Sequence, residues 1–191
     1  MTTQLTWYTA RAGGIVAWAL AAASVLWGLA LSTDLVRRRA RPAWLLDLHR
    51  FLGGAALVFT AVHVGSILLD PFVDFSPLDI LLPLASSWRP VAVAWGVAAM
   101  YLLLAVELTS LARRSMPTRL WRQVHLGSYA LFVVSTVHGV AAGTDAGSPV
   151  FLSVTAAVVT AVVAMTAVRF SRRRSRVRLA AREANIRASL G

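Results

Sequence analysis

The sequence predicts an all-α membrane protein, a polytopic bundle of about five transmembrane helices. Of its 191 residues, 58% are hydrophobic, and the mean hydropathy is +0.67, which is too high for a chain whose helices lie in water. Five apolar runs each have about the 20 residues that a helix needs to cross a bilayer. We place these runs at 12–34, 46–69, 90–112, 120–143 and 149–170.

The first run follows a single arginine, Arg11, and precedes the cluster RRRAR at 37–41. A cleaved signal peptide has its positive charge in front of its apolar core, which is the reverse of this order. We therefore expect a retained helix whose N-terminus lies outside.

The other runs are oriented by the positions of the arginines. All nineteen basic residues are arginines, and the formal net charge is +11. They gather after runs one and five and beside the loop between runs three and four, whereas the loop between runs two and three holds three aspartates. Short cytoplasmic loops are rich in positive charge, so the loops after runs one and three and the C-terminus are predicted to be cytoplasmic. This distribution predicts membrane lipid, and no nucleic acid, as a partner.

Two segments lie outside the runs. The outer loop from Asp70 to Pro90 contains PLDILLPLASSW, which is compatible with a short helix in the membrane interface or with an ordered loop. Residues 171–191 form a basic cytoplasmic tail, for which we expect a solvated end, with a helix on anionic lipid as the alternative. The chain is thus divided into a membrane bundle at 1–170 and this tail.

All four histidines lie in the second and fourth runs: His49 and His63 in one, His125 and His138 in the other. Ionisable side chains in hydrocarbon are costly and usually functional. Because the chain has no cysteine, a metal would have to be held by histidine, methionine or carboxylate. A rise of about 1.5 Å per residue separates the two histidines of each run by roughly 20 Å, too far to share one metal. We therefore predict two sites, His49 with His125 near the cytoplasm and His63 with His138 near the outside, each suited to a bis-histidine b-type haem.

The angular positions of these histidines differ between the two runs. At about 100° per residue, His49 and His63 share a face, whereas His125 and His138 point about 140° apart. The fourth run must therefore be overwound, kinked or strongly tilted, or present its histidines to different sides. Small residues near the histidines leave room for a porphyrin or for close helix packing: Gly53, Gly54, Gly65, Gly127, Ser128 and Gly139.

Charged residues near the cytoplasmic histidines are candidates for cofactor binding. Arg50 follows His49, and Arg122 precedes His125 by one turn. Their guanidinium groups could pair with haem propionates, although the positive-inside rule places both arginines here without a haem. For Glu107, late in the third run, we expect a snorkelling or arginine-paired carboxylate, with a proton path as the alternative.

The segments LHRFLGGAALVFTAVH and WRQVHLGSYALFVVSTVH resemble the ferric reductase-like transmembrane domain. Ferric reductases, NADPH oxidases and the haem-binding membrane subunit of the methionine sulfoxide reductase system share this domain. In that family, histidines with thirteen and about twelve residues between them, on two helices separated by one other, ligate two haems b. This chain has intervals of thirteen and twelve, and the resemblance covers runs two to five, with the family core at about 44–170. It implies axial-ligand roles for His49, His63, His125 and His138.

The resemblance also implies a function in the cell membrane, with a bacterial inner membrane as the expected location. Electrons would enter from a separate donor protein, a quinol or a flavin supplied by a partner, and would leave to an external acceptor. No G-x-G-x-x-G segment is present, so we expect no nicotinamide-binding domain of its own. Two alternatives stay open: a haem-bearing anchor subunit of a separate oxidoreductase, and a transporter without haem whose histidines relay protons or bind a transition metal.

Overall fold

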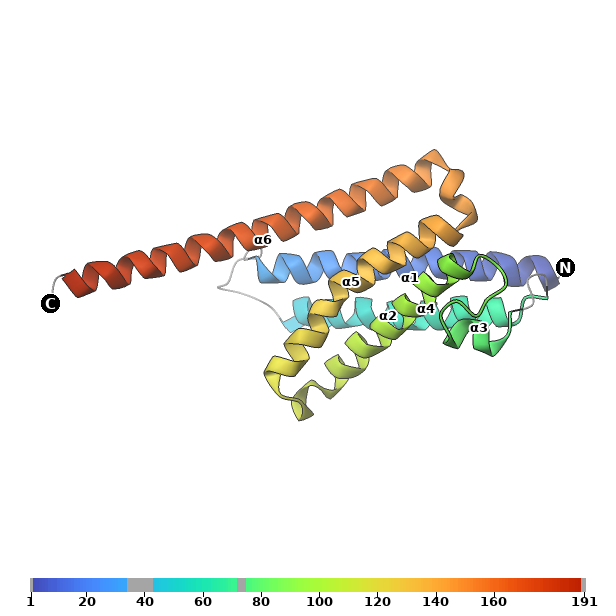
Figure 1. Ribbon diagram of the computed structural model, residues 1–191, viewed down its shortest axis with the longest axis horizontal. Coiled ribbons are helices and arrows are strands. Elements are labelled where there is room, and N and C mark those ends of the chain that lie inside the picture. Colours follow the sequence, from blue (N-terminus) through green and yellow to red (C-terminus); the bar gives the residue numbers. More distant parts are fainter. Residues whose placement is uncertain (1, 34–42, 72–74, 190–191) are drawn as a thin grey trace.

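The computed structural model describes residues 2–33, 43–71 and 75–189, and every secondary-structure element in these ranges is helical (Figure 1). The arginine cluster at 37–41 and Asp74 lie outside the described residues. The elements are, in order, α1 (Thr2–Ser32), α2 (Ala43–Leu68), α3 (Pro77–Leu81), α4 (Pro90–Leu111), η1 (Ala112–Ser115), α5 (Thr118–Ala142), η2 (Thr144–Gly147) and α6 (Pro149–Ser189). The predicted all-α class is confirmed.

Five of these helices are long and apolar enough to cross a membrane, and large apolar side chains on their surface, such as Leu111 (80% exposed), suit contact with lipid. The protein is therefore a multi-pass membrane protein. The spans agree with the five predicted runs within a few residues, except that the first begins earlier and includes Arg11. One arginine does not stop a helix, because its backbone hydrogen bonds stay intact and its long side chain can reach a polar surface. The spans are Gln4–Ser32, Ala43–Leu68, Pro90–Ser115, Thr118–Ala142 and Pro149–Arg172.

Proline and a capping box fix several helix starts. Pro77, Pro90 and Pro149 each stand at the first position of a helix, where the missing N–H costs nothing and the fixed φ favours helix. In α3, the Ser76 hydroxyl and the Asp79 carboxylate cap each other's backbone N–H groups. The outer loop thus contains a short helix.

The last helix is longer than the fifth predicted run. It continues as one α-helix to Ser189 and extends beyond the ends of the other helices (Figure 1). Residues 171–189, for which we preferred a solvated end to a helix, are therefore helical. The segment contains no glycine or proline after Pro149 and is rich in alanine and arginine, which have high helix propensity.

The helices pack mainly as two pairs, α1 with α2 and α4 with α5, and α1 also contacts α5 and α6. A core cluster of Ala22, Leu29, Phe132 and Val162 joins α1, α5 and α6. Figure 1 shows α4 and α5 running obliquely across α1 and α2. Because α5 is a single α-helix, this oblique course, rather than a break in the helix, accounts for the unequal angular positions of its two histidines.

Candidate functional site

The four histidines meet in two pairs, each between α2 and α5. The rings of His49 and His125 have centroids 6.0 Å apart and planes at 79°, and those of His63 and His138 lie 6.3 Å apart at 74°. These are the two pairs that the sequence predicted. We call them the inner pair and the outer pair, after the membrane sides to which the distribution of arginine assigns them.

Main-chain carbonyl groups orient both rings of the outer pair. His63 Nδ1 lies 2.6 Å from the carbonyl oxygen of Ala10 in α1, and His138 Nδ1 lies 2.8 Å from that of Ala92 in α4. Because a carbonyl oxygen only accepts hydrogen bonds, each Nδ1 carries the proton and donates it. The opposite nitrogen, Nε2, then has the lone pair that a metal bond requires.

The inner pair is held by different groups. His49 Nδ1 lies 3.2 Å from the hydroxyl of Ser24 in α1, whereas His125 Nδ1 is buried and has no hydrogen-bond partner among the described residues. The His125 ring stacks on Trp121, one turn earlier in α5, with centroids 5.0 Å apart. The Arg113 guanidinium lies 4.3 Å from the centre of the Trp121 ring. A hydroxyl and an aromatic stack therefore replace the two carbonyl groups of the outer pair.

Two glycines of α1 make room for the rings of α2. A methyl group on Gly14 would lie 2.9 Å from His63 Nδ1, and one on Gly28 would lie 3.1 Å from His49 Cε1. The two glycines have the same spacing as the two histidines, as expected for antiparallel helices in register. Neither glycine could be singled out from the sequence, because the matched interval has meaning only once α1 is known to lie against α2.

Gly96 of α4 has the same role for the ring of His138. A methyl group there would lie 2.7 Å from His138 Cε1, closer than packed atoms approach. By contrast, nothing lies within 4 Å of a methyl group placed on Gly54 or Gly65, which the sequence had singled out. Ordinary contact distances are found at Gly127 and Gly139.

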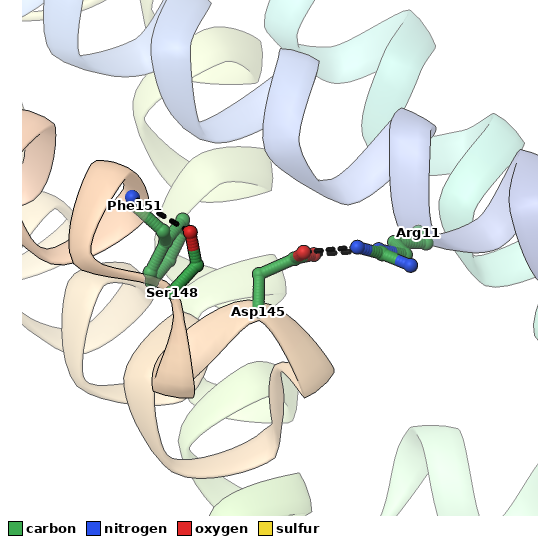
Figure 2. Close-up of polar contacts among 4 residues, drawn as sticks. All are labelled: Arg11, Asp145, Ser148 and Phe151. Atoms are coloured by element: carbon green, nitrogen blue, oxygen red, sulfur yellow. Dashed lines mark hydrogen bonds and ion pairs between the residues drawn. The ribbon is translucent and has the colours of Figure 1, made fainter.

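A cavity of about 280 Å³ opens beside the outer pair, and both His63 and His138 line it. Arg11 of α1 and Asp145 of η2 also line it and form an ion pair with two hydrogen bonds (Figure 2). The hydrogen bond from Arg11 holds the pKa of the Asp145 carboxyl below its usual range. This pair links α1 to the turn between α5 and α6 at the edge of the cavity.

The two arginines proposed from the sequence lie at the surface. Arg50 is 3.2 Å from Asp47 with both side chains exposed, and Arg122 is also exposed. A different arginine lies near the inner pair. Arg169 of α6 donates a hydrogen bond of 3.1 Å to the Tyr129 hydroxyl, one turn beyond His125 in α5.

Glu107 of α4 faces α2. Its half-buried carboxylate occupies the space into which a side chain on Gly53 would extend, one turn along α2 from His49. The arginine pairing that we expected for Glu107 is not found within the described ranges. The Glu107 carboxylate, which has no ion pair among the described residues, thus lies close to the inner pair.

Fold and site together define a class: a multi-pass helical membrane protein with two facing pairs of imidazoles between two of its helices. A family model described as the ferric reductase like transmembrane component matches residues 13–136. Because this match covers more than half of the chain, the protein belongs to that family. The match begins in α1, whereas the resemblance seen in the sequence began at the second run, and it ends two residues before His138.

Among curated proteins, the chain is similar to the protein-methionine-sulfoxide reductase heme-binding subunit MsrQ of Azospira oryzae, with 31% identity over 115 residues. The aligned segment covers 58% of this chain and 46% of that protein. The chain therefore spans less than half the length of this relative. No solved structure gives a significant match.

Proposed function

We propose that this protein is a di-haem b-type membrane cytochrome, in which the inner pair and the outer pair each ligate one haem. The distance between the paired rings carries this proposal. Two imidazoles bonded through nitrogen to opposite sides of one metal, at about 2.0 Å each, have ring centroids roughly 6 Å apart. The observed separations of 6.0 and 6.3 Å agree with this value.

The set of donor atoms favours haem over a bare metal ion. No group of three or more histidine, aspartate or glutamate side chains that could hold a metal ion is found within the described residues. Two protein ligands on opposite sides of a metal leave the plane between them to a macrocycle, as in haem. The similarity to a protein named as a heme-binding subunit supports the same choice, so a transporter that binds a free metal ion is the less favoured reading.

A bound haem supplies one-electron chemistry at its iron. The chain supplies axial imidazoles whose Nδ1 hydrogen bonds orient Nε2, an apolar surrounding, and two sites roughly 21 Å apart along α2. By the arginine rule, the inner pair faces the cytoplasm and the N-terminus lies outside. We therefore propose transfer of electrons from a cytoplasmic-side donor to an external acceptor.

The proposed donors are a separate protein, a quinol or a flavin supplied by a partner, and the outer loop from Asp70 to Pro90 is the proposed docking surface for the acceptor. A second candidate function is that of a haem-bearing membrane subunit of a separate oxidoreductase. The printed name of the relative, which is itself a subunit, favours this candidate. A subunit of this kind would not reduce an external acceptor by itself, but would do so together with its partner enzyme. Acceptor reduction measured in bacterial inner-membrane vesicles, with and without the partner, tests this candidate.

The experiment that tests haem ligation is a reduced-minus-oxidised absorption spectrum with quantified haem on the purified protein. We expect a b-type spectrum with two haems per chain, falling toward one in His63→Ala and in His138→Ala. Val62→Ala is the matched control, because Val62 neighbours His63 but is 40% exposed on the helix surface. A folded protein that stays colourless when haem is supplied would refute the proposal and leave proton relay or metal binding for the histidines.

A further inference from the structure

The four imidazoles differ in what their Nδ1 groups contact. Both rings of the outer pair donate to main-chain carbonyl oxygens, at 2.6 and 2.8 Å. In the inner pair, His49 has only the Ser24 hydroxyl at 3.2 Å, and His125 has no partner within the described ranges. None of the four residues is fully buried, and the rings of the outer pair lie deeper in the protein than those of the inner pair. The pairs therefore differ in both hydrogen bonding and burial.

A hydrogen bond from Nδ1–H to a strong acceptor makes the opposite nitrogen a more basic ligand. A more basic imidazole stabilises the oxidised, more positive state of an iron and so lowers its reduction potential. Short bonds to carbonyl groups should therefore lower the potential at the outer pair more than the longer hydroxyl contact lowers it at the inner pair.

The arginines act in the same direction, whereas the half-buried Glu107 carboxylate near the inner pair acts against it. Beside the inner pair, Arg113 lies over Trp121, which stacks on His125, and Arg169 bonds to Tyr129. These cations have no carboxylate partner among the described residues, and they favour the reduced state of a neighbouring metal. Beside the outer pair, the charge of Arg11 is offset by its ion pair with Asp145.

We infer, on the basis of the proposed haem ligation, that the two sites are unequal redox centres and that the inner one has the higher reduction potential. Ser24 is the positioning residue that sets His49, because its hydroxyl also contacts the His49 carbonyl oxygen at 3.5 Å and so faces back toward that residue. With haem bound, an electron from a cytoplasmic donor would rest mainly at the inner pair, and reduction of an external acceptor would require its uphill transfer to the outer pair. One electron moves between the sites, and no bond forms or breaks.

Redox potentiometry on the haem-loaded full chain tests this inference. In the wild type we expect two midpoint potentials, and His138→Ala, which keeps the inner pair, should retain the higher one. Ser24→Ala should shift the higher midpoint to a more positive value and leave the lower one unchanged, since removing the acceptor makes His49 less basic. Ser24→Thr, which keeps a hydroxyl, should restore the wild-type value.

Ser32→Ala is the matched control, because Ser32 is also in α1 but its hydroxyl bonds to Leu29 of the same helix. If the wild type binds two haems but His138→Ala retains the lower midpoint rather than the higher one, the inference is overturned and the proposed function stays intact. A Ser24→Ala protein whose midpoints both match those of Ser32→Ala would also overturn it. Absence of haem from the wild-type protein would instead refute the proposed function itself.

Discussion

Substitution of Gly96 by alanine should damage the outer pair specifically. A methyl group at Gly96 would lie 2.7 Å from His138 Cε1, whereas ordinary contact begins at 3.4 Å, so the ring must retreat by about 0.7 Å. The same movement would stretch the 2.8 Å hydrogen bond from His138 Nδ1 to Ala92 toward the limit of a hydrogen bond. The ring cannot move freely without losing that bond or its place opposite His63.

The expected magnitude follows from three opposing effects. Overpacking costs about 1–3 kcal/mol, and the weakened hydrogen bond costs about 0.5–1.5 kcal/mol. The higher helix propensity of alanine returns about 0.5–1 kcal/mol. We therefore expect a net loss of stability of about 0.5–4 kcal/mol, together with weaker retention of haem at the outer site.

The assay is haem retention and thermal unfolding in detergent, with Gly54→Ala and Gly65→Ala as controls. Both control positions have no atom within 4 Å of the added methyl group, so these variants should match or slightly exceed wild-type stability. If Gly96→Ala behaves like the controls in both measurements, the close packing of the His138 ring against Gly96 is refuted.

Two further predictions concern polar groups near the two pairs. Gly53→Ala should lower thermal stability less than Gly96→Ala does, because the atom that the new methyl group meets is the end of the flexible Glu107 side chain. In a double-mutant cycle, Glu107→Ala should remove this loss of stability. Strictly additive effects of the two substitutions would contradict the contact. Because the pKa of Asp145 is lowered in the folded state, its contribution to stability is complete above the unfolded-state pKa and is lost as pH falls through the folded-state value. Asp145→Asn should therefore lower stability slightly at neutral pH and flatten its decline in acid, and an unchanged acid profile would argue against the pair with Arg11.

The sequence by itself determined the features that depend on distance along one helix. The five spans follow from the length of each apolar run, and the division of four histidines into two sites follows from a fixed rise per residue. The choice of partners, His49 with His125 and His63 with His138, required only that α2 and α5 cross the membrane in the same direction. The alternation of apolar runs and arginine-rich loops supplied that condition.

Only the tertiary structure decided how the rings are held, since each contact joins different helices. The acceptors for His63 and His138 are main-chain carbonyls, which every residue has and which no sequence pattern can single out. Gly14, Gly28 and Gly96 look like ordinary small residues until the register between neighbouring helices places them against the histidines. The same register brings Arg11 to Asp145, so helix packing, and not local sequence, sets the environment of each pair.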